Sequence, residues 1–273
     1  MMKSLWLAAL LTVLLAFMDI SGIPCTLFMN VEILDIEPIY WSLMANFINM
    51  GIIATIFFRF LIPEWNLGFR ITGFREGLKK YALPGVLVGV ITGIAFCIGL
   101  YPFDQNPTVL KVVIEGIIYY IGVAIIEELY VRGLMLNLIE KVCAKKKNGT
   151  TIAIIISSCV FGLGHIFGVL GQPILVIATK VVWTTAMGLY FGMIYKKTNN
   201  LWLPIIMHFF INICALPYCF TTLQGYADIS LYIILPVYLF LGWYSLGIMF
   251  KWRKDEKKIA SSTKPDCCRI KER

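Results

Sequence analysis

The sequence contains little charge for its length. Only 15% of its 273 residues are Asp, Glu, Lys or Arg, whereas 59% are hydrophobic. Soluble domains average roughly 25% charged residues, so this composition excludes ordinary soluble enzymes and disordered tails. The eight cysteines include no CxxC spacing, which argues against a disulfide framework or a thiolate metal site. The composition therefore predicts an all-α, polytopic membrane protein.

Long apolar runs predict eight transmembrane helices, because about 20 mostly apolar residues are needed to cross the hydrocarbon core. The predicted spans cover residues 5–29, 41–62, 84–101, 109–138, 151–171, 173–195, 201–221 and 229–250. Two segments lie outside these spans. Residues 63–83 mix aromatic and basic side chains and are expected to lie along the membrane interface. The basic tail, residues 251–273, is expected to be disordered against anionic headgroups.

The basic residues predict the orientation of these spans. Of the 24 Lys and Arg residues, 22 lie on one side, and the loops on the other side carry only acidic charges. Because Lys and Arg are enriched in cytoplasmic loops, both termini are predicted to be cytoplasmic. The net charge of +8 therefore reflects topology, and no nucleic-acid partner is expected. The compact set of spans, without organelle-retention signals, favours a bacterial cell membrane.

Several polar residues fall inside the predicted spans, where charges are costly and usually functional. Four of them have structural explanations. Lys111 and Glu115 are four residues apart and can pair, Lys180 can extend toward the interface or toward Glu115, and Asp19 lies near the end of its span. The candidates for a functional site are the remaining residues Glu127, Glu128, Arg132, His165, His208 and Asn212.

The spacing of these candidates predicts a polar site near the middle of the membrane. Glu128 and Arg132 are spaced i, i+4 on one helix, which predicts an ion pair. Glu127 is rotated by about 100° from its neighbour and lacks this partner. His165 and His208 are the only histidines, and both fall within about 8 Å of the depth of Glu127, counted at 1.5 Å per residue. Three helices thus bring polar side chains to one depth.

Three motifs in order, each on its own span, carry a resemblance to a known family. Glu-Glu-x-x-x-Arg, Phe-x-x-x-His and His-x-x-x-Asn resemble the CPBP family, the CAAX-protease and bacteriocin-processing intramembrane endopeptidases, also called the Abi family and related to the CAAX prenyl protease. The resemblance implies a catalytic core in residues 109–221. The transmembrane helices in 1–108 precede this core, and the last helix and the basic tail in 222–273 follow it.

The resemblance also implies an activity and a role for each residue. It implies hydrolysis of a peptide bond in a membrane-associated or lipidated protein or in a peptide precursor. Glu127 is expected to activate a water molecule, and His165 to orient it. His208 and Asn212 are expected to donate hydrogen bonds to the tetrahedral oxyanion. The Glu128 ion pair is expected to hold the glutamate motif in place. No Ser or Cys lies in these motifs, which disfavours an acyl-enzyme.

A metal-dependent version of this site is also compatible with the residue types. His165, His208 and Glu127 have the composition of a two-His, one-carboxylate zinc site with an open position for water. The sequence lacks an H-E-x-x-H motif, and Asn212 beside His208 suits an oxyanion site better than a ligand shell. A hydrolase without a cofactor is therefore favoured over one that holds a divalent metal.

Two other functions are compatible with buried Glu, Arg and His residues. One is a non-catalytic bacteriocin-immunity or membrane-binding protein that keeps the motifs. The other is a proton-coupled transporter, which is disfavoured because no inverted repeats or paired broken helices are visible. The expected partners are membrane lipids and a membrane-embedded or lipidated peptide substrate. The sequence gives no indication of an oligomeric state.

Overall fold

The computed structural model describes residues 6–7, 9–14, 36–222 and 227–262, with the side chains of the last helix described through Trp252. All the secondary-structure elements found in this part of the chain are helices, which confirms the all-α prediction. The α-helices are α2 (Pro38–Leu61), α3 (Phe74–Leu100), α4 (Val109–Glu128), α5 (Asn137–Val142), α6 (Gly149–Gly164), α7 (Ile174–Thr198), α8 (Trp202–Cys214) and α9 (Asp228–Ser262). A π-helix, η2 (Leu129–Leu136), joins α4 to α5, and two 3₁₀ segments, η3 (His165–Val169) and η4 (Leu216–Phe220), follow α6 and α8.

Seven helical stretches in the described part of the chain are long and apolar enough to cross a membrane. They correspond to the second through eighth predicted spans. The first predicted span, residues 5–29, lies largely outside the described residues. A multi-pass membrane protein is therefore confirmed, as far as the chain is described.

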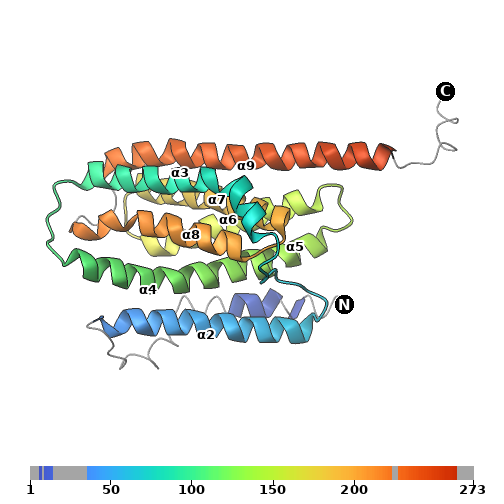
Figure 1. Ribbon diagram of the computed structural model, residues 1–273, viewed down its shortest axis with the longest axis horizontal. Coiled ribbons are helices and arrows are strands. Elements are labelled where there is room, and N and C mark those ends of the chain that lie inside the picture. Colours follow the sequence, from blue (N-terminus) through green and yellow to red (C-terminus); the bar gives the residue numbers. More distant parts are fainter. Residues whose placement is uncertain (1–5, 8, 15–35, 223–226, 263–273) are drawn as a thin grey trace.

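The helices form an elongated bundle in which elements distant in sequence are neighbours (Figure 1). α4 packs between α2 and α8, and α3 packs between α8 and α9. α7 packs against α6 and α9, and it is the most buried of the spans. The helices that carry the candidate residues therefore meet in the interior of the bundle.

Glycines allow α6 and α7 to approach closely. A Cβ atom at Gly188 would lie 2.9 Å from the Cα atom of Ser158, and one at Gly192 would lie 2.9 Å from the side chain of Ile154. These distances are shorter than real Cβ contacts, so a side chain at either position would push the two helices apart. Small residues of this kind are typical of packed transmembrane helices.

Part of the predicted interfacial segment, residues 63–83, belongs instead to a helix. α3 begins at Phe74 and continues through Pro84. Transmembrane helices tolerate proline because neighbouring groups satisfy the freed backbone carbonyl. Lys79 and Lys80 are exposed on this first part of α3. The prediction began the span at residue 84, whereas the helix begins ten residues earlier, at Phe74.

The prediction of disorder from residue 251 onward is also wrong for the part of the tail that is described. α9 continues to Ser262, beyond the predicted end of the last span. The twelve residues from 251 to 262 include four Lys, one Arg, one Glu and one Ala, which are strong helix formers. A helix that begins in the apolar span can therefore propagate beyond it without a new nucleation step.

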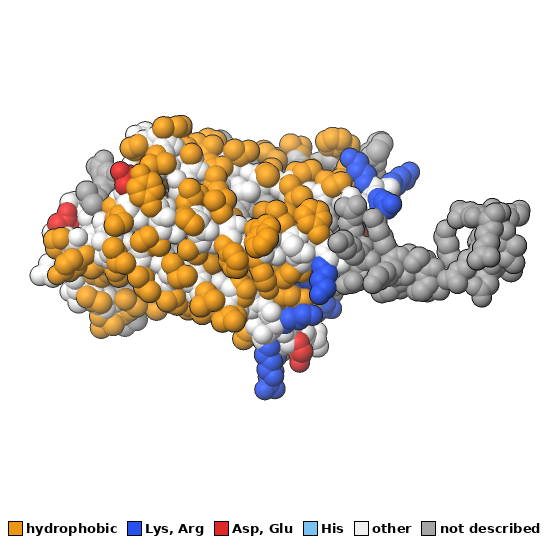
Figure 2. Space-filling view, turned by 90° about the horizontal axis from the view of Figure 1, so that it is seen from above, with side chains coloured by type: hydrophobic (Ala, Val, Ile, Leu, Met, Phe, Trp, Pro, Cys, Tyr) orange, Lys and Arg blue, Asp and Glu red, His pale blue; other side chains and the backbone are white. Residues whose placement is uncertain are grey.

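Charged side chains gather at the two ends of the bundle. Figure 2 shows a largely hydrophobic face with Lys and Arg side chains at one end and most of the visible acidic side chains at the other. A hydrophobic surface bounded by charged ends suits a protein surrounded by lipid. The cytoplasmic location of the basic end remains a prediction.

Candidate active site

The two adjacent glutamates lie at the end of α4, where the helix changes to π geometry. The π-helix η2 follows directly and contains Arg132. π segments are rare and are often found at functional sites. Asn137 donates hydrogen bonds to the carbonyl of Gly133 (2.7 Å) and to the hydroxyl of Tyr195 (2.9 Å), which ties the π segment to α7. Hydrophobic spacing alone gave no indication of this change in helix type.

The predicted ion pair between Glu128 and Arg132 is confirmed and fully buried. The Nη1 atom of Arg132 lies 2.9 Å from Oε1 of Glu128, and the side chains are 1% and 0% exposed. The Arg132 guanidinium also lies over the rings of Phe161 and Phe191, 4.5 and 5.2 Å from their centroids. The cation therefore neutralises a carboxylate inside the bundle and packs against aromatic faces.

His208 lies between the two glutamates. Its Nδ1 atom is 2.8 Å from Oε1 of Glu128, and its Nε2 atom is 3.7 Å from Oε2 of Glu127. The imidazole stacks on Phe191, with the ring centroids 5.2 Å apart. Because Glu128 is paired with a cation, it accepts the hydrogen bond from Nδ1–H, and Nε2 faces the second carboxylate.

Glu127 differs from its neighbour in its surroundings. Its side chain is 33% exposed, but its Oε2 atom is buried and has no hydrogen-bond partner among the described residues. A buried carboxylate oxygen without a donor is unusual in a folded protein. This oxygen is therefore available to a water molecule or a ligand.

His165 lies near His208 and Glu127, at the junction of α6 and η3. Its Nδ1 atom is 2.8 Å from the carbonyl oxygen of Phe161. A carbonyl only accepts, so Nδ1 carries the hydrogen and Nε2 of the neutral ring is an acceptor. The ring of Phe161 contacts both His165 and His208, with centroid distances of 4.6 and 6.1 Å. His165 also lies within electrostatic range of Glu127.

Asn212 follows His208 by four residues on α8 and is partly exposed. No hydrogen bond of its side-chain amide is found within the described chain. The common face of α8 thus presents an imidazole and an unused amide one turn apart. The structure therefore brings His208 into contact with Glu127 and Glu128, and Glu128 into contact with Arg132. His165 packs against the same Phe161 ring as His208, and Asn212 lies one turn along α8.

Lys180 is a further cation near the site. The sequence interpretation placed it at the interface or beside Glu115. Instead, Glu115 pairs with Lys111 at 3.9 Å, as predicted, and no ion pair with Lys180 is found in the described part of the chain. The Lys180 ammonium lies 4.8 Å from the ring centroid of Trp183, and its charge interacts with that of Glu127. The only signal in the sequence was the presence of a lysine inside a span.

The residue types of the candidate metal site do not assemble into a ligand group. Among the described residues, no three His, Cys, Asp or Glu side chains are placed to hold one metal ion. His165 uses Nδ1 for a backbone carbonyl and His208 uses Nδ1 for Glu128, so Nε2 is the ring nitrogen that each histidine has left for a ligand. As placed in this structure, the three side chains do not form a set of metal ligands, and a hydrolase without a metal stays a prediction.

The fold and the site define a polytopic helical membrane protein with a buried centre of carboxylates and histidines. Residues 109–214 match the family model described as Type II CAAX prenyl endopeptidase Rce1-like. This match confirms the resemblance indicated by the three motifs, and it includes all six candidate residues. Comparisons with curated proteins and with solved structures each found no match. At the level of the family, the match supports an intramembrane protease, a hydrolase of peptide bonds.

Proposed function

We propose that this protein is an intramembrane endopeptidase that uses water to hydrolyse a peptide bond in a membrane-associated or lipidated protein, or in a peptide precursor. One observation carries this proposal most directly. His208 lies between two adjacent carboxylates, of which one is neutralised by buried Arg132 and the other has an unpartnered oxygen. In such an arrangement Glu128 has a structural role, and Glu127 can act on a ligand.

In this proposal Glu127 is the general base. A water molecule bound to its Oε2 atom donates one proton to the carboxylate while the water oxygen attacks the peptide carbonyl carbon. The acceptor nitrogen of His165 takes a hydrogen bond from the other hydrogen of the water and thereby orients it. A positioned base of this kind contributes about 10²-fold to 10⁴-fold to a reaction rate.

His208 and Asn212 stabilise the tetrahedral intermediate. Each ring nitrogen of His208 faces a carboxylate oxygen, so in this proposal both nitrogens carry a hydrogen. Its Nε2–H donates to the oxyanion, and the Asn212 amide adds a second donor. Loss of one oxyanion donor typically costs about 10²-fold to 10³-fold in rate. When the C–N bond breaks, Glu127 returns its proton to the leaving amine.

Glu128 and Arg132 are positioning residues in this mechanism. Glu128 accepts the Nδ1–H hydrogen bond and so fixes the orientation of the His208 ring. Arg132 balances the charge of Glu128 in an apolar environment through the 2.9 Å ion pair. Neither side chain touches the substrate, and both act through His208.

Hydrolysis by this route needs no metal. Removal of divalent cations with a chelator from the purified protein is expected to leave cleavage unchanged. Loss of cleavage that returns only when zinc is added would favour the alternative ligand set of His165, His208 and Glu127, and would contradict a metal-free mechanism.

The activity is tested by profiling new N-terminal peptides in membranes of cells that express the wild type, Glu127→Gln or Glu115→Gln at matched levels. Glu115 lies on the same helix but pairs with Lys111, away from the site. New termini with the wild type and Glu115→Gln, but not with Glu127→Gln, are expected. If the wild type and Glu127→Gln give the same N-terminal peptides and the variant keeps the cellular phenotype, the result would favour a binding or immunity protein.

The proposed location is a bacterial cell membrane with both termini in the cytoplasm. The clustering of basic side chains at one end of the bundle supports this orientation (Figure 2). Reporter fusions after Arg273 are expected to be active in the cytoplasm. Activity only on the outer side would contradict the orientation.

A further inference from the structure

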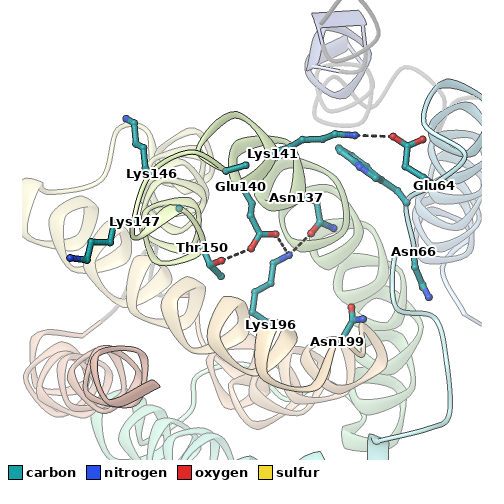
Figure 3. A pocket seen from close by; sticks show the side chains of 13 residues that line it. Glu64, Asn66, Asn137, Glu140, Lys141, Lys146, Lys147, Thr150, Lys196 and Asn199 are labelled. Carbon is teal, nitrogen blue, oxygen red and sulfur yellow. Dashed lines mark hydrogen bonds and ion pairs between the residues drawn. The ribbon is translucent and has the colours of Figure 1, made fainter. Parts of the chain in front are cut away.

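A polar cavity lies at one end of the bundle, apart from the candidate active site. Its volume is about 590 Å³. It is enclosed by the connection between α2 and α3, by α5, and by the adjoining ends of α6 and α7 (Figure 3). Its charged lining consists of Lys141, Lys146, Lys147, Lys196, Glu64 and Glu140. Because α5, α6 and α7 have their ends here, the cavity lies at the level of lipid headgroups.

The charged groups in the inner part of this cavity are paired with one another. Lys196 lies 2.5 Å from both Oε2 of Glu140 and Oδ1 of Asn137. The hydroxyl of Thr150 donates to the other oxygen of Glu140 at 2.6 Å, as Figure 3 shows. Both oxygens of Glu140 are therefore engaged, and this carboxylate is neutralised by Lys196.

The outer part carries positive charge that is weakly held or unpaired. Lys141 pairs with Glu64 at 2.8 Å, but the Glu64 side chain is 62% exposed, and exposed pairs of this kind are weak. This hydrogen bond lowers the pKa of Glu64, so the carboxylate is ionised at neutral pH. Lys146 and Lys147 are exposed, extend away from Glu140 in Figure 3, and form no ion pair within the described residues.

The charges of this lining favour an anionic ligand. Four lysines and two glutamates leave a net charge of +2, and this excess resides on Lys146 and Lys147. Lys141 can exchange its exposed partner for a stronger anion without breaking a buried contact. Lysine ammonium groups are common phosphate ligands, and basic pockets between transmembrane helices bind anionic headgroups.

We propose that the outer rim of this cavity binds the phosphate groups of anionic lipids, through the exposed Lys146 and Lys147 and through Lys141 once it exchanges Glu64 for a phosphate. The bound headgroup would anchor the loop between α5 and α6 to the membrane surface. This site is separate from the candidate active site and does not depend on the proposed activity.

The test uses purified full-length protein in detergent and counts bound lipids by native mass spectrometry. The protein is titrated with phosphatidylglycerol, with phosphatidylcholine as the neutral control, and with inorganic phosphate as a competitor. The variant Lys146→Gln/Lys147→Gln is compared with Lys79→Gln/Lys80→Gln. The control removes the same charge from two exposed lysines of α3.

Phosphatidylglycerol is expected to bind the wild type more tightly than phosphatidylcholine. Affinity is expected to fall by about tenfold or more in Lys146→Gln/Lys147→Gln and to stay unchanged in the α3 control. Glu64→Gln is expected to bind more tightly, because Lys141 then has no competing partner. Thermal unfolding of each variant verifies that it is folded.

Three outcomes would overturn the proposal. One is equal binding of the two lipids, and another is an equal loss of affinity in both double-lysine variants, which would indicate a general surface charge effect. The third is binding of inorganic phosphate that depends on Lys146 and Lys147, together with binding of phosphatidylglycerol that does not depend on them. That result would identify a site for free phosphate and not for the lipid.

Discussion

At the scale of single residues, Glu128 is the charge on which the polar centre depends. Its Oε1 atom accepts hydrogen bonds from both Arg132 and His208. The second oxygen of Glu128 and the Nη2 atom of Arg132 are buried without hydrogen-bond partners among the described residues. Loss of either charged partner is therefore strongly destabilising, because it leaves a buried charge that no neighbour can compensate.

Replacement of Arg132 tests this dependence. Arg132→Met is expected to lower the free energy of unfolding by about 3–5 kcal/mol, because Glu128 is left buried without its cation. Chemical unfolding in detergent measures the change. Arg75→Met, which removes an exposed arginine from α3, is the control and is expected to have little effect.

The double variant Arg132→Met/Glu128→Leu sharpens this test. Removal of both charges is expected to restore part of the lost stability, because no unpaired charge remains in the interior. Proteolytic activity is expected to stay absent, since His208 loses the group that orients it. A double variant no more stable than Arg132→Met would contradict the assignment of the ion pair as the source of the effect.

At the scale of elements, the contact between α6 and α7 helps to place His165, which follows directly after α6. Gly188 faces the backbone of Ser158 at a distance that no side chain can occupy. Gly247 of α9 has open space where a Cβ atom would be. Replacing each of these two glycines with alanine therefore compares a tightly packed position with an open one.

Gly188→Ala is expected to destabilise the protein, by about 1–3 kcal/mol for an overpacked position. Gly247→Ala is expected to be neutral or to stabilise by up to about 1 kcal/mol, because alanine is the better helix former. Thermal unfolding in detergent measures both variants. Equal effects of the two substitutions would show that helix propensity, and not the helix contact, determines the outcome.

A polar contact outside the spans joins the connection between α3 and α4 to the residues that follow η4. Asp104 accepts hydrogen bonds from the hydroxyl of Thr222 and from its backbone N–H, the latter at 2.7 Å. The hydrogen bond from the hydroxyl is the main cause that lowers the pKa of Asp104 below its ordinary value of 3.8. The stabilisation is therefore fully present above this value and is lost as the pH falls through the lowered one.

Hydrogen exchange measures this pH dependence. The protection factor of the Thr222 amide is expected to stay constant down to the ordinary pKa of Asp104 and to fall at lower pH. Asp104→Asn keeps an acceptor but does not titrate, so its protection factor is expected to be independent of pH in this range. A protection factor that falls well above the ordinary value would contradict the lowered pKa.

Some elements are readable from the sequence, whereas others depend on long-range contacts. Apolar runs predicted seven described spans, because the cost of crossing the hydrocarbon core is local to each segment. The start of α3 at Phe74 and the extension of α9 to Ser262 were missed, because hydropathy does not report helix formation outside the membrane. The π geometry of η2 was missed because hydrogen-bond register leaves no clear hydrophobic pattern.

At the scale of the whole molecule, the bundle brings together residues that are far apart in the sequence. Helical spacing predicted the pair of Glu128 with Arg132, since both lie on one helix. It did not predict that His208, 80 residues away, would bind Glu128, because the rotation of one helix against another is set by tertiary packing. The position of Lys180 near Glu127 was missed for the same reason.

The central claim is that Glu127 activates water for hydrolysis of a peptide bond. The most direct measurement is the initial rate of cleavage by purified protein in liposomes, with a substrate identified by N-terminal profiling. The wild type and the control Glu115→Gln are expected to cleave it, and folded Glu127→Gln to be slower by about 10²-fold or more. A folded Glu127→Gln variant that cleaves at the wild-type rate would contradict the account.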